Sequence, residues 1–159
     1  INKIKDAGIL LVYISTWILI LHIWLGAYYI IRYLKQENTI INYVLDLAPL
    51  ICMLIGVLSF HRLEIWGASF AILFTFAITK YKIINLSARN KLIKEYTNKK
   101  IRNEIVSVPL LIFLAVSAYM FKENITIIRF LQIMTLLSQF FFVVWLAYIK
   151  KVYSIFRKS

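Results

Sequence analysis

The stretch ILLVYISTWILILHIWLGAYYII, residues 9–31, decides the fold class. It contains no Asp, Glu, Lys or Arg, and charged residues flank it, with Asp6 before it and Arg32 after it. A helix of this length measures about 35 Å, which is enough to cross the hydrocarbon core of a bilayer with some tilt. The apolar core of a signal peptide is much shorter. The stretch therefore predicts a transmembrane helix.

The composition of the whole chain also indicates a membrane protein. Of its 159 residues, 62% are hydrophobic and 16% are charged, whereas a soluble domain is about 45–50% apolar and about 25% charged. The single cysteine, Cys52, excludes a disulfide framework, and two histidines are too few for a His-rich metal site. The sequence carries no motif of a metalloprotease, a serine hydrolase or a nucleotide-binding protein. We therefore expect one integral membrane domain over residues 1–159, with no cofactor and no enzymatic activity.

Further apolar stretches follow the first, so we expect an all-α bundle of about five transmembrane helices. In the second stretch, Asp46 and Pro49 are typical of a helix start, because aspartate caps free amides and proline is tolerated in a first turn. That helix is expected to begin at about Leu47 and to end at Phe60. The predicted spans are residues 9–31, 41–60, 65–84, 105–121 and 125–149.

A basic segment, residues 85–104, separates the third and fourth predicted spans, and we expect it to form a helical connection in the cytoplasm. Neither glycine nor proline occurs from Ala68 to Val108, so the third helix is expected to continue into it and to break at Asn98 or Asn103. Its charge suits an acidic partner protein or anionic lipid headgroups. The candidate contact residues are Arg89, Lys91, Lys94, Lys99, Lys100 and Arg102.

The net charge of +12 predicts the orientation of the chain. The cations lie between apolar stretches, so we expect contact with anionic headgroups and no direct binding of nucleic acid. Two spans separate residues 85–104 from the basic tail after Ile149, so both lie on one side, which the positive-inside rule makes cytoplasmic. The N-terminus then lies outside, where Lys3 and Lys5 fit poorly. A composition typical of AT-rich coding DNA favours a bacterial inner membrane over a mitochondrial one.

Five polar side chains within the predicted spans are candidates for function, because polar groups are costly inside a bilayer. His22 could relay protons, or could join two helices by a hydrogen bond, which we favour. Asp46 could couple a cation, although its context favours the helix cap. Arg129 could bind a substrate or snorkel to the surface, and we favour snorkelling. Thr135 and Gln139 share one helix face, which indicates contact between helices more than a pore lining.

Two functions fit these patterns. The first is a non-enzymatic subunit or accessory protein of a membrane complex, which docks a partner through residues 85–104 as a homo-oligomer or in a hetero-complex. In its small size, few spans and basic charge the chain is similar to small immunity and defence proteins of bacterial inner membranes. This resemblance is one of composition and architecture, and no motif carries it. The alternative is a small oligomeric channel or transporter for an ion or small solute.

Overall fold

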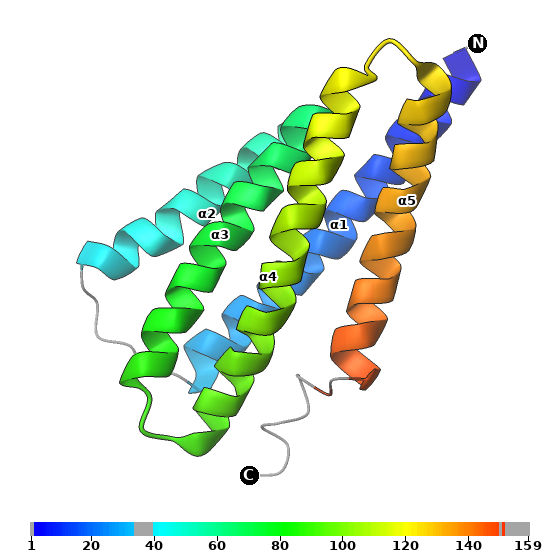
Figure 1. The fold of residues 1–159 in the computed structure, drawn as a ribbon. Helices are drawn as coiled ribbons and strands as arrows, with labels where there is room; N and C mark the ends of the chain where they lie inside the picture. Colours follow the sequence, from blue (N-terminus) through cyan, green and yellow to red (C-terminus); the bar gives the residue numbers. More distant parts are fainter. Residues whose placement is uncertain (1, 34–39, 150, 152–159) are drawn as a thin grey trace.

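The computed structural model describes residues 2–33, 40–149 and 151, and over this part the chain is all-helical, with five α-helices and no strand (Figure 1). This confirms the predicted fold class. The elements are α1 (Asn2–Tyr33), α2 (Ile40–Leu58), α3 (Leu63–Ser87), α4 (Lys91–Met120), α5 (Ile125–Val144) and a π-helical turn η1 (Trp145–Ile149).

Four of the described helices are long and apolar enough to cross a membrane. The chain is therefore consistent with a multi-pass membrane protein. The apolar part of α2, Asp46–Leu58, is shorter than the other four candidates, so a fifth span at residues 41–60 stays a prediction. The four candidate spans are Ala7–Gly26, Leu63–Ser87, Lys91–Met120 and Ile125–Tyr148.

The helices run roughly side by side, and their ends fall into two groups (Figure 1). The start of α1, the α2–α3 connection and the α4–α5 connection lie at one end of the bundle. The α3–α4 connection and the end of α5 lie at the other end, which we call the basic end because Arg89 and Lys91 stand there. Helices α2, α3 and α4 follow one another in space, and α1 lies beside α5.

Helix α2 begins earlier than the sequence indicates. It starts at Ile40, so Asp46 is an interior residue and not the cap, and Pro49 lies in the middle of the helix. An interior proline removes one backbone hydrogen bond, but membrane helices tolerate it because neighbouring groups satisfy the freed carbonyl. The prediction of a helix starting at about Leu47 was therefore wrong.

The chain turns between α3 and α4 at residues 88–90, and not at Asn98 or Asn103 as expected. Two asparagine side chains fix this turn. The Asn90 side chain caps α4 by accepting a hydrogen bond from the Leu92 amide at 2.9 Å. The Asn85 side-chain amide donates to Thr97 Oγ1 at 2.7 Å across the turn. Residues 91–103 therefore belong to α4, packed on α3, and do not form a separate connection.

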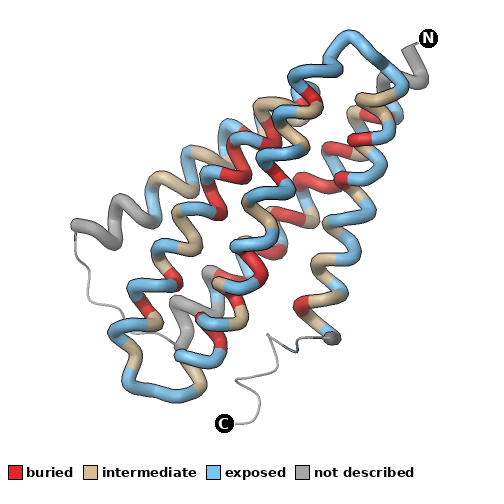
Figure 2. Tube along the Cα trace, in the orientation of Figure 1, coloured by how far each residue is buried: buried red, intermediate tan, exposed pale blue. Residues whose placement is uncertain are grey.

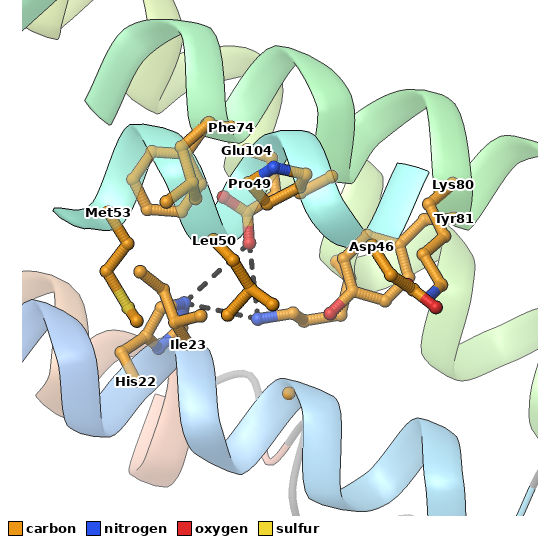
Figure 3. A pocket seen from close by; sticks show the side chains of 14 residues that line it. His22, Ile23, Asp46, Pro49, Leu50, Met53, Phe74, Lys80, Tyr81 and Glu104 are labelled. Atoms are coloured by element: carbon orange, nitrogen blue, oxygen red, sulfur yellow. Dashed lines mark hydrogen bonds and ion pairs between the residues drawn. The ribbon is translucent and has the colours of Figure 1, made fainter. Parts of the chain in front are cut away.

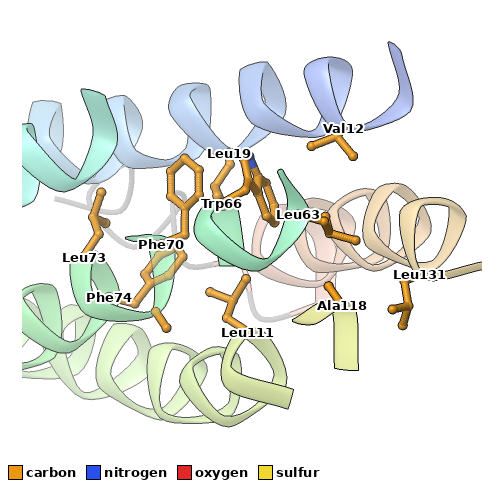
Figure 4. Packing of buried hydrophobic residues seen from close by; sticks show 11 residues of the cluster. Val12, Leu19, Leu63, Trp66, Phe70, Leu73, Phe74, Leu111, Ala118 and Leu131 are labelled. Carbon is orange, nitrogen blue, oxygen red and sulfur yellow. The ribbon is translucent and has the colours of Figure 1, made fainter. Parts of the chain in front are cut away.

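Trp66 lies at the centre of the hydrophobic core (Figure 4). Its side chain is fully buried, and its ring lies 4.9 Å from that of Phe70. Its indole Nε1 donates to Thr16 Oγ1 at 2.8 Å and so joins α3 to α1. On the other side of α3, a Cβ at Gly67 would stand 3.2 Å from the Leu111 carbonyl oxygen, so this glycine allows α3 and α4 to pack closely.

The outer surface of the bundle is apolar. Exposed residues follow the outward sides of the helices, and buried ones the facing sides (Figure 2). Large side chains such as Trp24 on α1, Leu54 on α2 and Phe113 on α4 are more than half exposed. Such a surface is suited to lipid, because a soluble protein rarely exposes so large an apolar area.

Candidate functional site: a buried charged cluster in an amphipathic cavity

Three ionisable side chains from two helices meet inside the bundle. His22 comes from α1, and Lys100 and Glu104 lie one turn apart on α4. Their exposed fractions are 3%, 1% and 1% respectively. We call these three residues the charged cluster. Ionisable groups within membrane helices are rare, and they commonly mark pathways for ions, protons or substrates.

The three side chains of the charged cluster bond to one another (Figure 3). Lys100 Nζ lies 3.1 Å from His22 Nε2 and 3.2 Å from Glu104 Oε1. His22 Nε2 lies 3.7 Å from the same carboxylate oxygen. His22 Nε2 faces both the Lys100 ammonium and the Glu104 carboxylate, so whether it donates or accepts depends on the tautomer of the imidazole. The cluster thereby ties α1 to α4.

The charged cluster is not fully satisfied by the described part of the chain. Glu104 Oε2 is buried there without a hydrogen-bond partner, and so is the neighbouring Asn103 Nδ2. A buried acceptor without a partner costs about 1–3 kcal/mol, and more when it is charged. A buried polar atom without a partner calls for an explanation, of which a functional role is one.

A cavity of about 380 Å³ adjoins the charged cluster between α1, α2, α3 and α4. This volume falls within the range of small-molecule sites, about 300–1,000 Å³. Most of its wall is apolar, and the polar groups are few. Its lining includes His22, Leu50, Met53, Leu73, Phe74, Ala77, Lys80, Tyr81, Lys100 and Glu104, with Gly26 and Asp46.

A second ion pair lies on the wall of this cavity. Lys80 Nζ on α3 bonds to Asp46 Oδ1 on α2. The Asp46 side chain is 55% exposed, whereas that of Lys80 is 16% exposed. The expected role of Asp46 as a helix cap is thus replaced by a contact between helices. The cavity is lined by two cations and two carboxylates, so its fixed charges balance.

Gly26 allows α1 to lie close to Tyr81 and Lys100 in the cavity wall. A Cβ at this position would stand 2.8 Å from the Tyr81 hydroxyl and 3.7 Å from Lys100 Nζ. The first distance is shorter than real Cβ contacts show, so any larger residue would displace the Tyr81 side chain. A glycine here allows Tyr81 and Lys100 to reach the helix α1 backbone.

Thr135 and Gln139 do not reach the charged cluster. They line a second cavity of about 270 Å³ between α4 and α5, together with Ser138 and several phenylalanines. The Thr135 hydroxyl donates to the Leu131 carbonyl on its own helix at 2.7 Å. Phe74 contributes to both cavities. Arg129 is half-buried near the start of α5, away from both cavity walls.

The cations of residues 85–104 differ in how far they are buried. Lys100 is buried in the charged cluster, which corrects its expected place among the surface contacts. Lys99 is half-buried and bonds to Glu95 at 3.1 Å. The other four side chains are exposed at the basic end or on the first turns of α4, namely Arg89, Lys91, Lys94 and Arg102.

Sequence reasoning identified His22 and Asp46 but missed their partners. Glu104 and Lys80 were not among the candidate residues, and Lys100 was placed among the surface contacts. One sequence pattern could have indicated that Lys100 and Glu104 are buried. Four residues recur at intervals of three and four and so share one face of α4, namely Tyr96, Lys100, Asn103 and Glu104. In the structure this face is buried. Comparisons of the chain with known protein families, curated proteins and solved structures find no match.

Proposed function

We propose that this chain is a small membrane carrier, which binds an ion or small solute in the cavity beside the charged cluster. The observation that carries the proposal is that His22, Lys100 and Glu104 line an apolar-walled cavity while buried in a bundle of membrane-type helices. Ionisable side chains cost free energy inside a bilayer, and those that occur there commonly take part in transport. The proposal involves binding and no chemical step.

The cavity is formed within one chain. This observation favours a carrier over the accessory subunit, which the sequence placed first. A channel was expected to need an oligomer, with polar groups around a shared axis. Instead His22 and Asp46 line one cavity whose wall comes from four helices of the same protomer. A single chain therefore offers the kind of pocket that a carrier requires, and this supports the carrier ahead of the accessory subunit.

The membrane placement that goes with the proposal follows the charges. We propose five spans, with α2 as the fifth, the basic end in the cytoplasm and the start of α1 outside. Exposed cations Arg89, Lys91 and Lys94 stand at the basic end, as the positive-inside rule requires of cytoplasmic loops. A bacterial inner membrane agrees with the composition of the chain.

A thermal-shift measurement in detergent tests the carrier. Cys52 is the single cysteine and is half-buried in α2, so a dye that fluoresces on binding thiols reports unfolding. One set of probes is potassium chloride, sodium phosphate, glutamate and lysine, and a second set is phospholipids added to the micelle. A ligand at one hundred times its Kd stabilises the folded state by about 2.7 kcal/mol, or about 5–10 °C in Tm.

The control for this test is a pair of alanines on α3. Ala77 lines the cavity, and Ala68 is exposed on the outer surface. Ala77→Trp fills the cavity and is expected to abolish the shift produced by the active probe, whereas Ala68→Trp retains it. If neither set of probes raises Tm, or if the shift survives Ala77→Trp, the carrier proposal is wrong.

The accessory subunit is kept as a second candidate because of the four exposed cations of the α3–α4 region. Arg89, Lys91, Lys94 and Arg102 are exposed in a chain with few acidic side chains nearby. We propose that this surface docks an acidic partner protein in a hetero-complex.

Charge reversal tests the docking surface. Replacing Lys91, Lys94 and Arg102 together by glutamate is expected to remove a co-purifying protein from gently extracted complexes, because each reversal turns attraction into repulsion. Membrane insertion should persist, as the three side chains are exposed. Lys100 must be left unchanged, since it is buried beside Glu104. The docking surface is refuted if the intact mass of the complex is the same for the variant and the native chain.

A further inference from the structure

Helix α2 forms one wall of the cavity and lies at the edge of the bundle. It contributes Asp46, Pro49, Leu50 and Met53 to the lining. It packs mostly against α3, with few contacts to α1, and it stands on the side of the bundle opposite α5 (Figure 1). The most extensive contact between described helices is the one between α3 and α4. Because that contact does not involve α2, α2 can move while the rest of the core stays in place.

The last turns of α2 are held tightly on α3. Gly56 is buried, and a Cβ at this position would stand 2.7 Å from Cε2 of the Phe70 ring, closer than real Cβ contacts come. The chain then turns into α3 within a few residues, and the Arg62 amide donates to the Ser59 carbonyl in this turn at 2.9 Å. Close packing and a short turn therefore fix this end of α2.

Toward its start, α2 is held on α3 by the Asp46–Lys80 ion pair. Asp46 lies ten residues before Gly56, which is about 15 Å along a helix. The Asp46 side chain is 55% exposed, and a partly exposed ion pair is a weak link compared with core packing. Asp46 and Lys80 both line the cavity, so a charged solute inside it competes for their bond.

Pro49 lies inside α2 between these two contacts. Proline has no amide hydrogen, so one backbone hydrogen bond of the helix is missing at this level. Sharp bends in helices commonly occur at proline. The segment that carries Asp46 can therefore move relative to the tightly packed segment around Gly56.

We propose that α2 is the gate of the cavity, with the Asp46–Lys80 ion pair as its latch and the contact of Gly56 with Phe70 as its fixed end. When the latch breaks, the start of α2 swings away from α3 and the cavity widens. A solute group that binds Asp46 or Lys80 replaces the latch bond, so occupation of the cavity and the position of α2 are linked. The gate rests on the proposed carrier function, for which it names the moving part.

Distances between spin labels, measured by double electron–electron resonance on the full chain in detergent, test the gate. The background variant is Cys52→Ser, which removes the single native thiol. One label pair joins Leu47→Cys on α2 to Phe141→Cys on α5 and reports on the latch end. A second pair joins Leu58→Cys on α2 to Phe130→Cys on α5 and reports on the fixed end. All four positions are exposed, and the two helices stand on opposite sides of the bundle (Figure 1).

Asp46→Asn removes the negative charge of the latch and keeps the size of the side chain. We expect it to increase the open population about fivefold, the factor that corresponds to loss of a partly exposed ion pair. Leu47 lies nine residues from Gly56, so a tilt of about 20° about the fixed end moves it by about 5 Å. The first label pair should therefore gain a second distance, longer by about this amount, and the second pair should stay unchanged.

Two further variants control for this effect. Glu95→Gln breaks the partly exposed Lys99–Glu95 pair within α4, and it should leave both distances as in the native chain. Exchange of the latch residues, Asp46→Lys with Lys80→Asp, keeps an ion pair of reversed direction and should restore the native distances. Asp46→Lys alone places two cations side by side, and it should open the gate further than Asp46→Asn does.

The outcomes separate the gate from the carrier proposal. Equal distances in the native chain and Asp46→Asn, equal lengthening of both label pairs, or failure of the exchanged pair to restore the native distances would each overturn the gate. If a probe gives a thermal shift that Ala77→Trp abolishes while Asp46→Asn leaves the distances unchanged, the carrier stands and the gate is wrong. If Asp46→Asn opens α2 as expected but no probe gives such a shift, the carrier is wrong while the latch stands.

Discussion

Replacing Glu104 by leucine is expected to lower the free energy of unfolding by about 3–5 kcal/mol, the cost of breaking a buried ion pair. The substitution leaves the Lys100 ammonium in the bundle, 1% exposed, without the carboxylate that lies 3.2 Å away. The His22 imidazole remains, but it carries no negative charge and cannot balance the ammonium. Titration with sodium dodecyl sulfate in mixed micelles, followed by circular dichroism, measures the loss.

Two controls test whether the loss of stability comes from burial of the Lys100–Glu104 pair. Lys100→Met combined with Glu104→Leu removes both charges, and it should recover most of the lost stability, because apolar residues replace a buried pair at little cost. On the same helix, Lys99 and Glu95 form a pair with the same spacing that is partly exposed. Glu95→Leu is expected to change stability by at most about 1 kcal/mol. Equal losses for Glu95→Leu and Glu104→Leu would contradict the buried cluster.

Replacing Trp66 by alanine is expected to cost about 3–5 kcal/mol of unfolding free energy, the range for large aromatic residues removed from a core. The Trp66 side chain is fully buried, packs on Phe70, and joins α3 to α1 through its 2.8 Å hydrogen bond to Thr16. Its removal leaves a cavity between α3 and α1. The same detergent titration measures the effect.

Trp24 provides the matched control for this second substitution. It lies on α1 with 67% of its surface exposed on the outside of the bundle. Trp24→Ala should therefore change the free energy of unfolding by no more than about 0.5 kcal/mol, as is usual for surface positions. A loss for Trp66→Ala no larger than for Trp24→Ala would show that the core is not centred on Trp66.

Apolar length alone predicted where three of the long apolar helices lie. The stretches at residues 9–31, 65–84 and 125–149 each lie within or coincide closely with a described helix long and apolar enough to cross a membrane. Helix starts were harder to predict. Asp46 and Pro49 resembled a cap and a first turn, yet the helix begins at Ile40. Local signals of capping are weak, and continued helix formation overrides them when the flanking residues also favour helix.

The charged cluster was predicted only in part. His22 was identified because its depth in an apolar stretch is visible in the sequence. Its partner Lys100 lies 78 residues away, and no local pattern joins the two. Lys100 was grouped with surface cations because its neighbours Lys99 and Arg102 are basic. On a helix, however, adjacent residues point about 100° apart, so neighbours in the sequence can have opposite environments.

The sequence by itself determined that the described part of the chain is all-helical, with helices long and apolar enough to cross a membrane. It could do so because the apolar length of a segment is a local property of the sequence. Only the tertiary structure decided that residues 91–103 belong to α4 and pack on α3. That packing turns the face of Tyr96, Lys100 and Glu104 inward, where α1 supplies His22 and α2 and α3 complete the cavity. The physical reason is that burial of a charge depends on which helices surround it, and that is a non-local property of the bundle.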